Sequence, residues 1–205
     1  NADAPRVFRV APEAGAGRLR LVEGRVVPVA LIMMLFTLPF TATQAFLVTL
    51  TELEGLAVPV GLFFPIYAGV VLVLRLALRR ILDHVPFGCF LAVSAVCAAC
   101  GLLSLAAMRG FWLMTAAAVF MAGGYGMMCT VCQSTAILLA RPGGRGLANG
   151  TYYVGIDLGM ALGPLAGGFL LGHAPLGWFF PAFLLTVPAL LAVYALGRGV
   201  FARLR

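Results

Sequence analysis

The sequence contains no lysine and few charged side chains, with 14 arginines, 7 acidic residues and 2 histidines among its 205 residues. Charged residues make up 10% of the chain and hydrophobic residues 62%, and the mean hydropathy is +1.05. A water-soluble globule of this size needs far more polar surface than these residues can supply. The composition therefore excludes a soluble domain and predicts that membrane lipid surrounds most of the chain.

Motifs that carry chemistry are also lacking. The sequence has no Ser/His/Asp arrangement, no HExxH zinc motif and no phosphate-binding glycine loop. Cys97 and Cys100, like Cys129 and Cys132, have the spacing of metal or redox pairs, but both pairs lie in apolar segments without a basic neighbour to stabilise a thiolate. We therefore expect no enzyme activity, no cofactor and no bound metal.

The excess of arginine over acidic residues gives a formal net charge of +7, which in another chain could indicate a nucleic-acid partner. Here nearly all the arginines flank apolar segments, and none alternates with aromatic residues on a polar face. We therefore expect no nucleic-acid partner.

Long apolar stretches occupy most of the chain. About 20 apolar residues span a bilayer, so the chain has room for about six spans and their connections. The last charge-free stretch is roughly twice that length and is broken at residues 172–177 by turn-forming residues, so it holds parts of two helices. The predicted helices cover residues 26–50, 56–78, 86–108, 111–139, 147–171 and 176–197. The sequence therefore predicts an all-α membrane protein with a six-helix transmembrane region at residues 26–197.

The arginines are distributed unequally between the two sides of this predicted bundle. All of the 14 arginines except Arg109 precede the first helix, follow the last helix, or lie at the end of the second helix and in the connections after the second and fourth helices. Cytoplasmic segments of membrane proteins carry an excess of Arg and Lys. This distribution predicts that both termini are cytoplasmic, with residues 1–25 as a basic linker and residues 198–205 as a tail. It also requires an even number of spans.

Asp157 is the one charged residue well inside a predicted helix. Counted from Leu147 at about 1.5 Å per residue, it lies roughly 15 Å deep, near the middle of the bilayer. A carboxylate at this depth is costly and is usually kept where it faces a cavity or a partner. Two interpretations remain open, because Asp157 could couple proton or cation movement to transport or could be a structural hydrogen-bonding acid.

The helix that contains Asp157 also carries a ladder of small residues. Glycine recurs at every fourth position, which lets the backbone of another helix approach closely. At 100° per residue, Asp157 lies about 160° around the helix from the first two of these glycines. The predicted packing residues are Gly155, Gly159, Gly163, Pro164 and Gly167. The helix that packs on this face therefore cannot be the element that neutralises Asp157.

Polar side chains recur at helical spacing in the first and fourth predicted helices, and Tyr153 of the fifth helix is grouped with them. The candidate substrate-cavity residues are Thr37, Thr41, Gln44, Tyr125, Gln133 and Tyr153. In the alternative interpretation these hydroxyls and amides join helices to one another, at about 0.6 kcal/mol for each hydrogen bond.

Two segments carry a resemblance to a known family. Residues 75–84 read RLALRRILDH, which resembles the loop signature RPxxGRxxDRxG of the major facilitator superfamily, with Arg75, Arg80 and Asp83 at matching positions. Residues 145–164 read RGLANGTYYVGIDLGMALGP and resemble the entry to the eleventh helix of bacterial facilitators akin to multidrug and metallophore exporters. The resemblance implies that the three charged residues form a cytoplasmic network that bridges helix ends.

The same resemblance extends to residues 63–68, FFPIYA, which are similar to the eighth helix of those transporters, and so it covers most of residues 26–197. It implies that the chain is the C-terminal six-helix half of a twelve-helix transporter, with residues 1–25 as the central cytoplasmic loop. An N-terminal six-helix half would then be its partner, and the bacterial inner membrane its location.

Three functions are consistent with these patterns. The first is proton-coupled export of a small organic molecule by alternating access, in which Asp157 or acids of the other half carry the proton. The second is uptake or facilitated transport of a metabolite or organic anion by the same fold. The third, from a different class, is a six-helix membrane scaffold or enzyme that acts alone.

Overall fold

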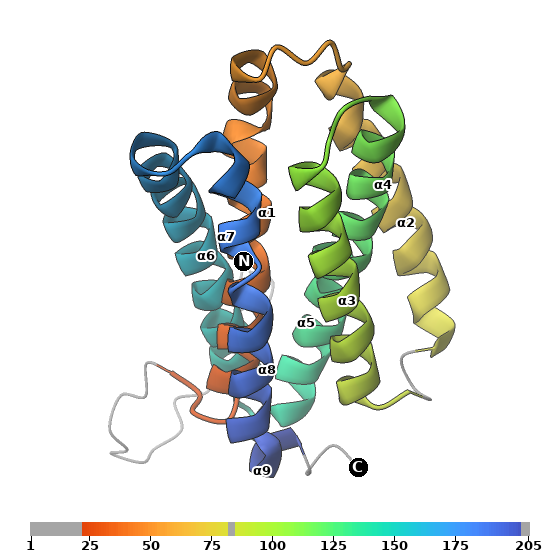
Figure 1. The fold of residues 1–205 in the computed structure, drawn as a ribbon. Helices are drawn as coiled ribbons and strands as arrows, with labels where there is room; N and C mark the ends of the chain where they lie inside the picture. Colours follow the sequence, from red (N-terminus) through yellow and green to blue (C-terminus); the bar gives the residue numbers. More distant parts are fainter. Residues whose placement is uncertain (1–21, 82–84, 202–205) are drawn as a thin grey trace, which may run out of the picture.

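The computed structural model describes residues 22–81 and 85–201, and every regular element in these ranges is helical (Figure 1). Six helices are long and apolar enough to cross a membrane, which confirms the all-α fold and the number of such helices predicted from the sequence. They cover Val27–Leu53, Val60–Leu78, Phe87–Ala106, Phe111–Leu139, Arg145–His173 and Leu176–Leu196.

Three of the six are continuous α-helices, and three are interrupted. The continuous ones are α1 (Val27–Leu53), α3 (Phe87–Ala106) and α6 (Arg145–His173). The second consists of the 3₁₀ turn η1 (Val60–Leu62) and α2 (Phe63–Ile81), and the fourth of α4 (Phe111–Met121), the π-helical turn η2 (Ala122–Gly126) and α5 (Met127–Leu139). The sixth consists of η3 (Leu176–Trp178), α7 (Phe179–Phe183) and α8 (Thr186–Leu196), and the short α9 (Arg198–Phe201) follows.

The interruptions coincide with glycine and proline. In η2, a Cβ atom added to Gly124 would lie 3.1 Å from the backbone of Ala98, so α3 packs against this turn at a distance that only glycine permits comfortably. The helix breaks between α7 and α8, shortly before Pro188. In a continuous helix the Pro188 ring would crowd the carbonyl group of Leu184.

α1 is the central helix of the bundle. It makes its most extensive contact with α6 and also packs on α8 and α5, whereas α3 and α2 both pack on α4. In Figure 1, α3 and α8 stand at the front, and α6 and α2 lie at the left and right edges. The second, fifth and sixth spanning helices, which include α2, α6 and α8, have fewer buried residues than the other three.

The apolar core consists of two clusters stacked along the bundle. One contains Ile32, Met33, Phe36, Leu91, Met128 and Tyr152, and the other contains Phe40, Leu47, Phe63, Leu102, Met114 and Phe179. Phe36 and Phe40 are one turn apart in α1 but belong to different clusters, and Tyr125 packs against both. The middle of the bundle therefore lies at the level of residues 36–40 of α1.

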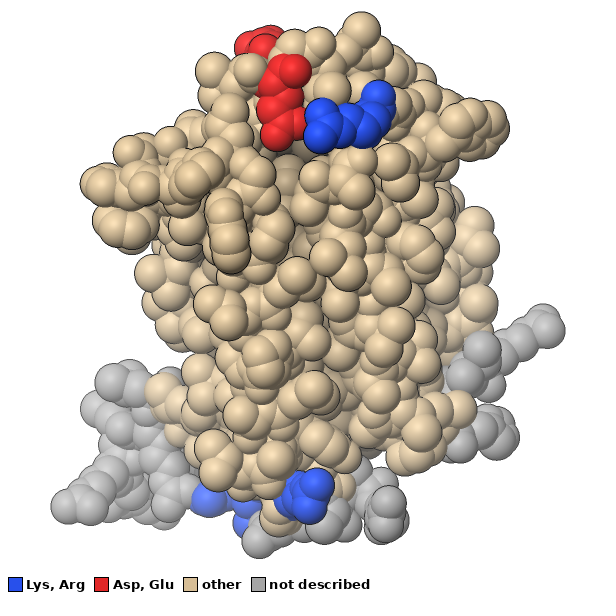
Figure 2. Space-filling model, in the orientation of Figure 1, with Lys and Arg blue, Asp and Glu red and all other residues tan. Residues whose placement is uncertain are grey.

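Large apolar side chains cover the outside of the bundle. Leu72, Val96 and Leu165 are between 61% and 70% exposed. Among the described residues, the face shown in Figure 2 carries charged side chains only at its two ends, with uncharged residues between them. An uncharged belt between charged ends is the surface expected for helices that cross a bilayer.

The two ends of the bundle differ in charge. The chain order places Arg141, Arg145 and Arg198 at one end, which we call the basic end. Glu52, Glu54, Arg109 and His173 lie at the other, which we call the opposite end.

A short segment before α1 is attached to the basic end. Glu23 is only 4% exposed, and its carboxylate lies 3.5 Å from Nε of Arg141. The Glu23 backbone N–H donates a 2.9 Å hydrogen bond to the hydroxyl of Thr151 in α6. The last residues of the predicted linker are therefore packed against the bundle, whereas residues 1–21 and the tail residues 202–205 lie outside the described part of the chain.

Candidate functional site

Asp157 lies near the middle of α6, 12 residues after Arg145 and 16 before His173. At about 1.5 Å per residue this helix is roughly 43 Å long, so the carboxylate is well inside a bilayer that the helix would cross. Its side chain is exposed, and within residues 22–81 and 85–201 it takes part in no ion pair. Lipid tails cannot solvate a carboxylate, so this face of α6 requires water or a second polar surface.

The opposite face of α6 packs tightly on α1. A Cβ atom added to Gly159 would lie 2.6 Å from Cβ of Thr37 and 2.8 Å from the carbonyl oxygen of Met34. Gly163 would similarly come within 2.5 Å of the Leu38 carbonyl oxygen. The glycine seam consists of Gly155, Gly159, Gly163 and Gly167, with Pro164 inside the helix beside it. The structure thus places the predicted packing residues and Asp157 on different sides of α6.

Polar side chains from α5 lie beside the Asp157 face. Nε2 of Gln133 donates a 3.2 Å hydrogen bond to the hydroxyl of Tyr153, which is 44% exposed and lies one turn before Asp157. The neighbouring Tyr152 is 1% exposed, and its hydroxyl donates a 2.8 Å bond to the carbonyl oxygen of Cys129. Tyr152 therefore fastens α6 to α5, whereas Tyr153 presents its hydroxyl at the surface with Asp157.

The three candidate residues of α1 are not equivalent in the structure. The Thr37 and Thr41 side chains are buried in the contact with α6, and the Thr41 hydroxyl lies 3.2 Å from the carbonyl oxygen of Gly159, to which it can donate. Thr37 donates to the Met33 carbonyl oxygen of its own helix at 2.8 Å. Gln44 is exposed. Of these three, only Gln44 is placed where it could line an open cavity.

Tyr125 forms part of an aromatic layer at the middle of the bundle. Its ring stacks on that of Phe40, with centroids 4.2 Å apart and planes 8° apart, and the ring of Tyr67 lies 4.9 Å from Phe40. The π-helical turn η2 positions Tyr125 for this contact, and such turns occur often at functional sites. Tyr125 is therefore half-buried in the packing between the two core clusters, together with Phe40 of α1 and Tyr67 of α2.

The predicted charge network is only partly visible. Arg75 is exposed and lies within α2, six residues before the helix ends at Ile81, rather than in a loop. The Arg80 side chain and Asp83 lie outside the described part of the structure. The pairing of these three residues thus stays a prediction.

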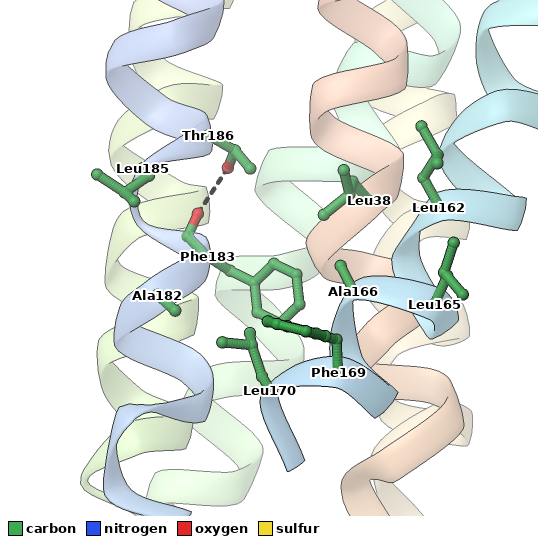
Figure 3. Close-up of a pocket in the computed structure, with 10 residues that line it drawn as sticks. All are labelled: Leu38, Leu162, Leu165, Ala166, Phe169, Leu170, Ala182, Phe183, Leu185 and Thr186. Carbon is green, nitrogen blue, oxygen red and sulfur yellow. Dashed lines mark hydrogen bonds between the residues drawn. The ribbon is translucent and has the colours of Figure 1, made fainter. Parts of the chain in front are cut away.

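An apolar groove of about 660 Å³ runs between α6 and the α7–α8 segment (Figure 3). Its lining consists of Leu38, Leu162, Leu165, Ala166, Phe169, Leu170, Ala182, Phe183, Leu185 and Thr186. The Thr186 hydroxyl donates to the Phe183 carbonyl oxygen at 2.8 Å, so the groove's one polar side chain is already satisfied. The groove has the character of a surface that acyl chains cover.

Three residues between the site and the basic end have contacts or burial that the sequence did not indicate. Glu23 and Tyr152 form the contacts described above, and Oδ1 of Asn149 is buried without a hydrogen-bond partner in the described structure. Helical spacing could have indicated Asn149, because it lies eight residues before Asp157. In the same described ranges, no three His, Cys, Asp or Glu side chains come together as metal ligands, and all five cysteines are free.

Comparison with protein-family models, with curated proteins and with solved structures gives no match to this sequence. The function is therefore inferred from the positions and contacts of the described residues.

Proposed function

We propose that this chain is the six-helix half of a secondary transporter of the major facilitator type, and that it exports a small organic molecule in exchange for protons. It would reside in the bacterial inner membrane with the basic end in the cytoplasm, as the arginine distribution indicates. The observation that carries the proposal is the exposed Asp157 carboxylate, at mid-length of a spanning helix and beside the Gln133–Tyr153 pair.

The exposed polar and charged side chains on α6 and α2 support the proposal of a second six-helix half. Asp157 and Tyr153 lie on α6, an edge helix, and Arg75 lies on α2, the other edge helix. Polar groups at this depth require a partner or a water-filled cavity rather than lipid. A second six-helix unit packed between these edges would cover them and enclose a polar space, where transporters of this architecture hold substrate.

Proton coupling follows from the absence of a fixed counter-charge. Asp157 has no cationic partner among the described residues, and a carboxylate held at membrane depth without such a partner is stabilised when it binds a proton or cation. A site that is neutral when protonated and charged when not changes its interaction with a neighbouring substrate. This difference is what couples proton binding to a change between two transporter conformations.

One observation favours a second candidate, the transport of an organic anion in the uptake direction. Arg75 is an exposed cation within α2, roughly 9 Å along the helix from its end. An arginine here can pair with a carboxylate or phosphate group of a substrate. In this candidate the fold is unchanged and proton coupling is absent.

The two candidates differ in proton movement. Full-length protein would be reconstituted in liposomes that contain a pH-sensitive dye and loaded with members of a panel of organic cations, anions and neutral compounds. The export proposal predicts that an outward gradient of a transported compound drives protons inward. Transport of an anion without a pH change would support the second candidate, and absence of transport for every compound would contradict both.

A further inference from the structure

The polar residues of α6 form a stripe that reaches Asp157 from one end only. Arg145, Asn149, Tyr153 and Asp157 follow one another at intervals of four residues, over roughly 18 Å of helix. Residues at this spacing are neighbours on the helix surface. Beyond Asp157, residues 158–172 are all apolar or glycine, and the next polar side chain is His173. The stripe therefore connects Asp157 with the basic end and not with the opposite end.

We propose that this stripe is the route by which Asp157 exchanges protons with the basic end, and that the Tyr153 hydroxyl is the group that transfers them. The inference rests on the proposed function, because it assumes that Asp157 binds and releases a proton. The inference adds that this proton route serves one side of the membrane only. Exchange with the opposite end would use groups outside α6, such as those of the other half.

The hydrogen bonding of Tyr153 suits this role. Gln133 donates to the hydroxyl oxygen at 3.2 Å, so the Tyr153 proton is not used in that bond and can point to another acceptor. Asp157 is the next residue of the stripe. In one transfer, the Tyr153 proton passes to the Asp157 carboxylate while a hydronium ion on the basic side gives a proton to the Tyr153 oxygen. One hydronium becomes water, the carboxylate becomes a carboxylic acid, and Tyr153 stays neutral.

The segment between Tyr153 and the basic end has room and polarity for water. The buried Oδ1 atom of Asn149 lacks a partner in the described structure, and buried carbonyl oxygens of this kind are normally satisfied by ordered water. Gly146 and Gly150 lie next to it on α6, and a Cβ atom added to either would meet nothing within 4 Å. A water molecule bound to the Asn149 oxygen would therefore lie between the end of α6 and Tyr153.

Few other ionisable groups could replace Tyr153. Apart from Asp157 itself, the ionisable residues of α6 and of the described helices packed on it are Arg145, Tyr152, Tyr153, His173, Cys129, Cys132 and Glu52. Arg145, His173 and Glu52 lie in terminal turns, Cys132 is fully buried, and Cys129 is half-buried. The Tyr152 proton is held by the Cys129 carbonyl oxygen. Tyr153 is thus the one group of this set that is both exposed and adjacent to Asp157.

The test measures protonation of Asp157 directly and needs no substrate. Full-length protein in oriented proteoliposomes would be followed by time-resolved infrared spectroscopy of the protonated carboxyl band, assigned by its loss in Asp157→Asn. The pH would be lowered on one side at a time. We expect Tyr153→Phe to slow protonation from the basic end by about a hundredfold, the lower end of the contribution of a positioned proton donor. Protonation from the opposite end is expected to keep its rate.

Two further variants separate this role from a structural one. Tyr152→Phe removes the neighbouring hydroxyl, which joins α6 to α5, and is expected to keep the wild-type rate from both sides. Asn149→Leu places an apolar side chain in the stripe and is expected to slow the basic side alone. Equal slowing from both sides, or no slowing in Tyr153→Phe, would overturn the proposal. One-sided protonation in a protein that shows no coupled transport would support the route and contradict only the proposed function.

Discussion

Replacing Asp157 by asparagine is expected to reduce substrate-driven proton movement to the level of protein-free liposomes. The amide is nearly the same size as the carboxyl group, but it cannot take up and release a proton in the relevant pH range. The side chain is exposed and unpaired among the described residues, so the substitution leaves no buried partner unsatisfied. The bundle should therefore stay folded while coupling is lost, as measured with an entrapped pH-sensitive dye.

Glu54→Gln is the matched control for this substitution. Glu54 is an exposed carboxylate that follows the last residue of α1, at the opposite end of the bundle. Both variants remove one negative charge, so a general electrostatic effect on transport would appear in both. Loss of coupling in Asp157→Asn alone supports a role at mid-membrane depth. Unchanged proton movement in a folded Asp157→Asn protein would remove Asp157 from the mechanism.

Replacing Gly159 by valine is expected to prevent α1 and α6 from packing as they do here. Even the first carbon of the new side chain would lie 2.6 Å from Cβ of Thr37 and 2.8 Å from the Met34 carbonyl oxygen. These atoms belong to or adjoin the backbone of α1, so they cannot move aside without separating the helices. Overpacking of this kind typically costs about 1–3 kcal/mol, and a branched side chain against a backbone should lie at or above the upper end.

Gly172→Val provides the comparison, since position 172 is near the end of the same helix and a Cβ there would meet nothing within 4 Å. Both variants place the same β-branched residue in α6, so the intrinsic helix-propensity effect is similar. The free energy of unfolding would be measured by denaturation in mixed detergent micelles. We expect a large loss for Gly159→Val and a small change for Gly172→Val. Similar values for the two variants would show that the glycine seam is not a tight contact.

Hydropathy, the turn-forming residues at 172–177 and the arginine distribution together were sufficient to predict six apolar helices, because about 20 consecutive apolar residues have few structural alternatives. Helical geometry also separated Asp157 from the glycines, since 100° per residue applies to any α-helix. The interruptions at η2 and between α7 and α8 were not predicted. The turn η2 depends on how closely α3 approaches Gly124, which the local sequence does not contain. Pro188, in contrast, could have indicated the break between α7 and α8.

The candidate residues of α1 show a similar limit of prediction from helical spacing. Thr37, Thr41 and Gln44 are spaced to share a face, but α6 covers the first two and leaves the third exposed. Spacing defines a face without defining which neighbour covers it. The contact between Glu23 and Thr151 joins residues 128 positions apart, so no local pattern could indicate it. Contacts between residues so far apart in the sequence are visible only in the three-dimensional structure.

The central claim is that the face of α6 with Asp157 does not contact lipid tails. Nitroxide labels attached through Asp157→Cys and Val96→Cys would be compared in full-length protein in bilayers, after the five native cysteines are replaced. Val96 is 63% exposed on the apolar surface of α3 and serves as the lipid-facing reference. The account predicts far fewer collisions with lipid-dissolved oxygen at position 157 than at position 96. Equal oxygen accessibility at the two positions would contradict it.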